Sequence, residues 1–127
     1  MSAKKNFKVL LVDNEEDFLD VFGNLLEMDG HTVRCAPGYN EALALVEAED
    51  FDVVVTDYSM PGMHGIFLLE MVKDIKPNLP VIIVTAYGNE EINAKAKRKG
   101  ADLVLNKPFK HEELVAGIKK ALKKWQR

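Results

Sequence analysis

The sequence predicts an α/β protein built on one doubly wound, five-stranded parallel sheet with helices on both faces. Short apolar runs rich in β-branched residues alternate along the 127 residues with segments of helical period, and no linker, repeat or low-complexity segment interrupts them. The run at 53–56 is typical of a strand covered by helices on both faces. Strands joined in this way pair in parallel through right-handed crossovers.

Five strands are expected, at residues 7–12, 31–36, 53–56, 81–85 and 103–105. The second alternates polar and apolar residues, which predicts a strand at the edge of the sheet. The first and third are apolar and should be central, at the point where the order of the strands reverses.

Five helices are expected, at residues 17–28, 39–48, 65–75 and 89–99 and after residue 109. Gly30 and Gly100 should end the first and fourth helices, and Asn89 should cap the start of the fourth. The fourth helix has few large apolar residues, so we expect it to pack weakly. The inward stripes of the first, third and last helices are predicted to be Phe18, Val21, Phe22, Leu25 and Leu26, then Ile66, Leu69, Val72 and Ile75, then Leu114, Ile118, Ala121, Leu122 and Trp125.

The composition indicates a single domain over residues 1–127, with a core at about 7–123, because 47% of the residues are hydrophobic. No apolar run is long enough to span a membrane, and the start lacks the apolar segment of a secretory signal. The single cysteine, Cys35, excludes an internal disulfide and fits a cytoplasmic protein; we expect a buried structural thiol.

The net charge of −3 conceals an acidic first part, residues 1–90, and a basic last part, residues 91–127. We expect the basic part to be the solvated face of two helices rather than a nucleic-acid surface, because arginine is scarce and aromatic residues are few among the lysines.

Polar side chains follow the apolar runs at the points where strands should end. Asp13 follows the first strand, Asp57 the third and Lys107 the fifth, and Thr85 ends the fourth. Each alone could be a helix cap, a strand residue or a solvated charge. Parallel strands end at one edge, however, so these residues should meet there. Paired carboxylates suit Mg²⁺, a lysine and a hydroxyl suit a phosphoryl group, and a carboxylate can form an acyl phosphate.

These pieces resemble the receiver domain of the two-component response regulator family, from about residue 8 to about residue 122. The matching segments are Val9-Leu10-Leu11-Val12-Asp13, Asp57-Tyr58-Ser59-Met60-Pro61-Gly62-Met63-His64-Gly65, Val84-Thr85-Ala86, and Gly100-Ala101-Asp102 with Lys107-Pro108-Phe109. The resemblance implies the flavodoxin-like strand order 2-1-3-4-5, in a (βα)5 three-layer sandwich.

The resemblance also implies the chemistry. Asp57 would accept a phosphoryl group from a phosphohistidine of a sensor histidine kinase or a phosphotransfer protein. Lys107 would pair with the phosphoryl oxygens, Thr85 would bond one of them, and the Lys107–Pro108 peptide would be cis. The protein would modify itself rather than act as an enzyme, with at most slow self-dephosphorylation.

Mg²⁺ is the implied cofactor. Its ligands would be Asp13, Asp57 and the backbone carbonyl of Ser59, with Asn14 a weak ligand or one that acts through water. The implied phosphodonor site includes the first helix. The fourth helix, fifth strand and fifth helix would form the output surface toward an unknown partner protein or effector domain, and would offer a surface for a homodimer. No membrane or direct nucleic-acid partner is expected in this bacterial family.

Three positions depart from the family pattern. Asn14 stands where a second acid is usual, which predicts weaker Mg²⁺ binding unless Glu15 compensates. Val104 stands where the family has a switch aromatic, and Tyr87 is the nearest aromatic replacement. His64 occupies a place often taken by Asp or Asn, and we expect an exposed loop residue there rather than a pH sensor or metal ligand.

Two rival functions do not fit the same residues. A haloacid-dehalogenase-type phosphatase needs an acid where Ser59 stands, and a nucleotide-binding protein needs a glycine-rich loop after the first strand. The alternative left open is a receiver-fold adaptor that binds proteins without phosphorylation, for which Asn14 and Val104 are the evidence.

Overall fold

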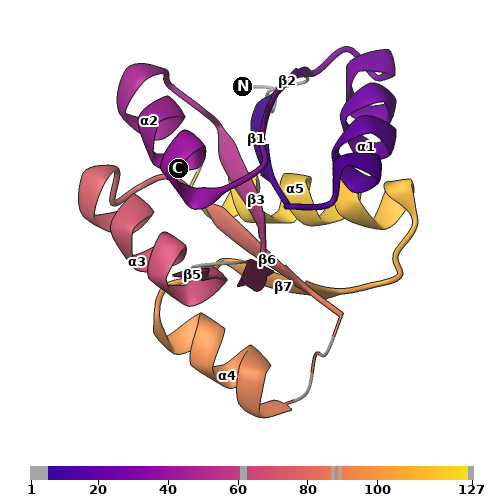
Figure 1. Cartoon of the computed structure of the whole chain (residues 1–127). Coiled ribbons are helices and arrows are strands. Elements are labelled where there is room, and N and C mark those ends of the chain that lie inside the picture. Colours follow the sequence, from indigo (N-terminus) through magenta and orange to yellow (C-terminus); the bar gives the residue numbers. More distant parts are fainter. Residues whose placement is uncertain (1–5, 61–62, 87, 89, 126–127) are drawn as a thin grey trace.

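The sheet has the predicted five parallel strands. The computed structural model describes residues 6–60, 63–86, 88 and 90–125 (Figure 1). The strands run in the order β2-β1-β3-β6-β7, which confirms the predicted order and its reversal between the first and third strands. β2 lies at an edge, as predicted. The strands are β1 (Lys8–Val12), β2 (Thr32–Ala36), β3 (Val53–Asp57), β6 (Val81–Thr85) and β7 (Leu103–Asn106).

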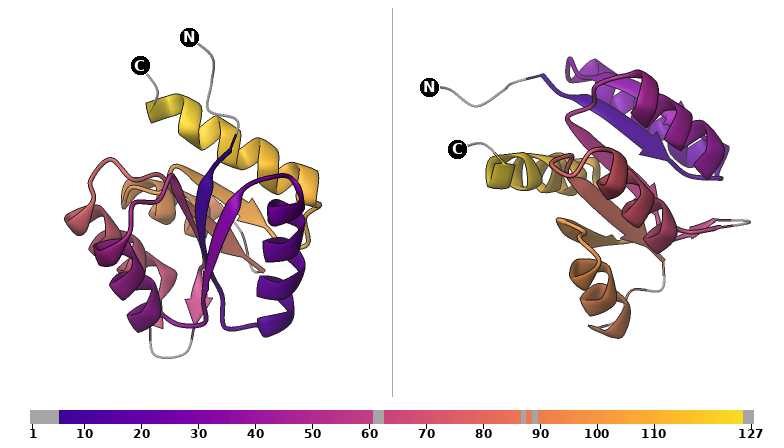
Figure 2. Two further views of the ribbon diagram at one scale, coloured as in Figure 1. Left: turned by 90° about the horizontal axis from the view of Figure 1, so that it is seen from above. Right: turned by 90° about the vertical axis from the view of Figure 1, so that its left-hand side faces the viewer.

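Five helices cover the two faces, giving three layers (Figures 1 and 2). The helices are α1 (Glu16–Met28), α2 (Tyr39–Ala48), α3 (Gly65–Ile75), α4 (Glu90–Arg98) and α5 (His111–Trp125). Residues of α1 and α5 form a core with one face, and residues of α2, α3 and α4 form a second core with the other. Side chains alternate along each strand, so that Leu10 enters one core and Leu11 the other. No helix among the described residues has the length and apolar character needed to cross a bilayer.

The ends of α1 and α4 follow from glycine, as predicted. Gly30 and Gly100 have φ angles of 95° and 111°, a region that favours glycine. α4 buries only Ala96 among its described side chains. Asn89, the predicted cap of α4, lies outside the described residues, as does the side chain of Trp125.

The inward stripe of α1 differs from the prediction. Leu19, Gly23 and Leu26 are buried, whereas Val21 is 53% exposed. The helix is therefore rotated on the sheet relative to the orientation that its apolar residues alone suggest. α3 buries Ile66, Leu69 and Val72 as predicted, but not the more exposed Ile75 at its last turn.

Two further expectations were wrong. Cys35 is exposed rather than buried, because β2 is an edge strand, although partial burial still raises the pKa of its thiol. The segment after β3 is not simply a loop. It contains a short antiparallel hairpin of β4 (Ser59–Met60) and β5 (Met63–His64), which projects from the domain in Figure 2. The backbone of His64 thus belongs to a strand, and its side chain lies outside the description.

A buried histidine fixes the start of β1. His31 is 7% exposed, and its ring stacks on Phe7 with the centroids 4.5 Å apart. The backbone N–H of Phe7 donates to Nδ1 of His31 at 3.0 Å. That bond requires an unprotonated Nδ1. Burial lowers the pKa of His31, partly offset by the charge of Asp29.

We predict that His31 makes the fold sensitive to acid. The unfolded chain binds this proton near the ordinary pKa of 6.5, and the folded chain binds it only at lower pH. The contribution to stability is therefore complete above that value and is lost as the pH falls below it. His31→Gln, which keeps an acceptor but does not titrate, should lose less free energy of unfolding between about pH 8 and about pH 5 in urea titrations. Equal losses in both proteins would contradict the prediction.

Candidate functional site

Two carboxylates lie side by side at the carboxyl edge of the sheet. Val12 of β1 pairs with Thr56 of β3, so Asp13 and Asp57 occupy the next pair of positions on adjacent strands. The side chain of Asp13 is fully buried, and its Oδ1 accepts the N–H of Glu15 at 2.8 Å. Asp57 is half-buried. The register of the two central strands therefore brings together the two acids that the sequence singled out.

Lys107 follows the edge strand β7, and its side chain reaches Asp13. Its backbone N–H donates to the carbonyl of Thr85 at 2.8 Å, and Thr85 itself is buried at the end of β6. Its Nζ donates to Oδ2 of Asp13 at 3.0 Å. The Lys107–Pro108 peptide is cis, as expected. Asp13, Asp57, Thr85 and Lys107 are thus all at the edge that the parallel topology predicted.

The electrostatics of the site favour an added cation. Burial and the charge of Asp13 raise the pKa of Asp57, and the charge of Lys107 and the N–H groups of Ser59 and Tyr58 only partly oppose this. Burial lowers the pKa of Lys107, but its hydrogen bond to Asp13 and the nearby carboxylates outweigh burial, and the net pKa is raised. The carboxylates of Asp13 and Asp57 carry more negative charge than the single positive charge of Lys107 balances.

The donor set fits a hard divalent cation with few protein ligands. Within the described ranges, no three His, Cys, Asp or Glu side chains gather in a way that could hold a metal. Two carboxylates are therefore available here, together with neutral oxygens. Asn14 is exposed beside Asp13, and Ser59 begins β4 two residues after Asp57. Carboxylates, carbonyls and water are the ligands that Mg²⁺ takes in such sites.

The backbone after Asp57 is closely packed. The N–H of Gly65 donates to the carbonyl of Tyr58 at 2.6 Å. A Cβ at Gly65 would overlap the backbone of Asp57 and Tyr58. Glycine is therefore required where α3 begins, and this close approach fixes the chain that follows the acid.

The sequence patterns did not predict two contacts of Lys107. Its Nζ lies 3.3 Å from Oε1 of Glu15 and 4.4 Å from the ring centroid of Phe18. Phe18 was predicted as a core residue, and it does pack in an aromatic group with Phe22 and Phe109. The available signal was the pair of phenylalanines four residues apart together with the phenylalanine two residues after the lysine.

One of the departures from the family pattern, Val104, lies in an edge strand of the sheet. Val104 of β7 is half-buried against the core that contains Ile83. Tyr87, the aromatic replacement considered for it, lies outside the described residues.

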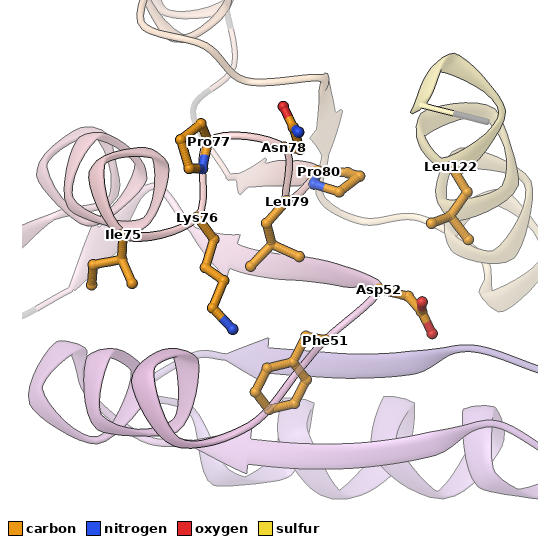
Figure 3. A pocket seen from close by; sticks show the side chains of 9 residues that line it. All are labelled: Phe51, Asp52, Ile75, Lys76, Pro77, Asn78, Leu79, Pro80 and Leu122. Carbon is orange, nitrogen blue, oxygen red and sulfur yellow. The ribbon is translucent and has the colours of Figure 1, made fainter. Parts of the chain in front are cut away.

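A cavity lies at the opposite edge and takes no part in this chemistry. Its volume is about 490 Å³, and its lining residues include Phe51 and Pro80, which precede β3 and β6 (Figure 3). The charged groups in it already have partners. Nζ of Lys76 bonds Asp50, and Asp52 accepts the N–H of Lys8.

Comparison with known proteins identifies the family. Residues 9–119 match the model of the response regulator receiver domain. The chain belongs to this family. It is 34% identical over 116 residues to the C4-dicarboxylate transport transcriptional regulatory protein DctD of Rhizobium meliloti, a match that covers 91% of this chain and 25% of that protein. The chain spans about a quarter of the length of the curated relatives it matches.

Solved receiver structures share the fold. A CheY-like receiver domain protein from Methanospirillum hungatei superposes with a TM-score of 0.88 at 32% identity, covering 94% of this chain and 95% of that one. A response regulator from Burkholderia pseudomallei, solved with a phosphorylated aspartic acid, a calcium ion and citrate, has a TM-score of 0.84 at 29% identity and covers 88% and 66%.

Membership of this family confirms the predicted function class. Receiver domains are phosphoacceptors of two-component signalling and are generally not enzymes, and the family generally binds Mg²⁺ at the phosphorylation site. The comparisons do not favour the phosphorylation-independent adaptor.

We predict that the negative charge of Asp13 contributes to the raised pKa of Asp57. Asp13→Asn removes a negative charge that raises the pKa of Asp57 and releases Lys107 from its partner, so the pKa of Asp57 should fall. Carbon-13 NMR titration of the Asp57 carboxyl in metal-free protein measures it. Asp74→Asn, at the far end of α3, is the control with the same change in charge. An unchanged pKa in Asp13→Asn would attribute the shift to burial alone.

Proposed function

We propose that the chain is a single receiver domain over residues 1–127, with its core at about 7–123, and that Asp57 is its phosphoacceptor. The position of Asp57 carries this proposal. It is half-buried at the end of a central strand, beside the buried Asp13 that pairs with Lys107. The phosphorylated aspartic acid in the similar Burkholderia pseudomallei protein supports it.

The transfer uses Asp57 as a nucleophile. A carboxylate oxygen of Asp57 attacks the phosphorus of a phosphohistidine, a P–O bond forms, and the P–N bond breaks. The imidazole nitrogen leaves with the electron pair and takes a proton from solvent. Lys107 stabilises charge on the phosphoryl oxygens, and the Thr85 hydroxyl donates a hydrogen bond to one of them. These groups position charge and do no covalent chemistry of their own.

The residues proposed to hold Mg²⁺ are Asp13, Asp57 and the carbonyl of Ser59, with Asn14 contributing weakly or through water. When bound, the ion supplies positive charge that neutralises the two carboxylates and the phosphoryl oxygens. The raised pKa of Asp57 supports a cation here.

The proposed partners follow from the family. The phosphodonor is a sensor histidine kinase or a phosphotransfer protein. The output surface is α4, β7 and α5, which face an effector domain or a separate partner protein and offer a surface for a homodimer. Basic side chains in the last turn of α4, namely Lys95, Lys97 and Arg98, favour an acidic partner there.

Asp57→Asn should abolish the phosphoryl gain. The test is intact mass after incubation with Mg²⁺ and acetyl phosphate, where wild type should show a labile gain of one phosphoryl group. The control Asp74→Asn should be labelled like wild type, because Asp74 is exposed at the far end of α3. Equal labelling of Asp57→Asn and wild type would show that another residue is the acceptor.

Asn14→Asp should tighten Mg²⁺ binding by about tenfold, since a carboxylate replaces a neutral amide beside Asp13. Titration of metal-free protein with Mg²⁺, followed by NMR, measures the affinity. Asn78→Asp is exposed at the opposite edge and is expected to change little. If the affinity is unchanged in Asn14→Asp, Asn14 does not limit the site.

A further inference from the structure

Lys107 has two contacts that the proposed transfer to Asp57 does not require. Its ammonium lies between the carboxylates of Asp13 and Glu15, at 3.0 and 3.3 Å, and above the ring of Phe18 at 4.4 Å. Asp13 and Glu15 are the only acids within 4.0 Å of this ammonium among the described residues. All three groups are at or after the end of β1, so in this structure the lysine is held on the α1 side of the site.

The contact with Phe18 has structural support. Phe18 packs on Phe22 with the centroids 4.7 Å apart, and both rings contact Phe109, two residues beyond the lysine. The aromatic group therefore joins the start of α1 to the segment that carries Lys107. The lysine side chain is only 18% exposed, so water screens its contacts with the ring and with Asp13 less than it screens a surface pair.

Glu15 is the more exposed of the two carboxylates that contact Lys107. Its side chain is 66% exposed, so its attraction for the ammonium is partly screened. Its backbone is fixed, however, because its N–H bonds Oδ1 of Asp13. The same turn thus presents a buried and an exposed carboxylate to one ammonium.

We propose that Glu15 and Phe18 are positioning residues that hold Lys107 away from Asp57 until Asp57 is phosphorylated. This inference rests on the proposed role of Asp57. A phosphoryl group on Asp57 attracts the ammonium, and contacts on the α1 side are then given up. Contacts made in only one of two states bias the equilibrium toward that state. Glu15 and Phe18 therefore oppose the phosphorylated form.

The test compares two variants with matched controls. Glu15→Gln and Phe18→Leu should each raise the phosphorylated fraction at limiting acetyl phosphate, or lengthen the lifetime of the phosphorylated form, by about twofold to fivefold. Glu16→Gln makes the same change in charge one residue later, and Phe67→Leu makes the same truncation at an exposed position of α3. Both controls should match wild type.

A spectroscopic readout tests the contact itself. The ring of Phe18 should shift the Lys107 side-chain protons upfield in unphosphorylated wild type. The shift should disappear in Phe18→Leu, persist in Phe67→Leu, and disappear in wild type when Asp57 is phosphorylated.

The outcomes separate the two proposals. Wild type that gains no phosphoryl group overturns the role of Asp57 and this inference with it. Wild type that is phosphorylated, while Glu15→Gln and Phe18→Leu behave like their controls, overturns only the positioning role. An upfield shift that persists after phosphorylation also overturns only the positioning role, because the contact between Lys107 and Phe18 would then be common to both states.

Discussion

The ion pair between the buried carboxylate of Asp13 and the ammonium of Lys107 is the interaction on which the site depends. Asp13 is inaccessible to solvent, and an unpaired charge there would be strongly destabilising. Asp57 beside it adds a second negative charge that the same lysine only partly offsets. The carboxyl edge of the sheet therefore carries more negative than positive charge, whereas the interiors of the central strands are apolar. A divalent cation or a phosphoryl group changes this balance more than it would at a solvated surface.

The parallel sheet is what makes this imbalance possible. Strands of one direction end at one edge, so polar residues that are far apart in sequence converge there while the strand interiors remain apolar. Val54 and Ile83 lie in one core and Val55 and Ile82 in the other. Apolar cores on both faces hold the ends of β1 and β3 in register. The stability of the fold therefore resides in residues other than those that carry the chemistry.

Sequence patterns predicted the features that depend on burial and on direction. The segment before Asp57 was recognisable as a central strand because three consecutive valines stand in it, and Lys107 was placed because all strand ends share an edge. The rotation of α1 was not predictable, since Leu19 and Val21 are both apolar and only packing on the sheet and α5 buries the first and exposes the second. The same holds for Phe18, whose contact with Lys107 depends on Phe109 from the other end of the chain. The hairpin after Asp57 has too few residues for a periodic pattern.

Asp13 and Lys107 are 94 residues apart in the chain. Asp13 and Asp57 stand at the ends of central strands, whereas the lysine follows the edge strand β7. A partly folded chain in which β1 has paired with β3 but β7 has not joined the sheet would hold the two carboxylates together without the charge of the lysine. The charge balance of the site therefore depends on the last strand being in place.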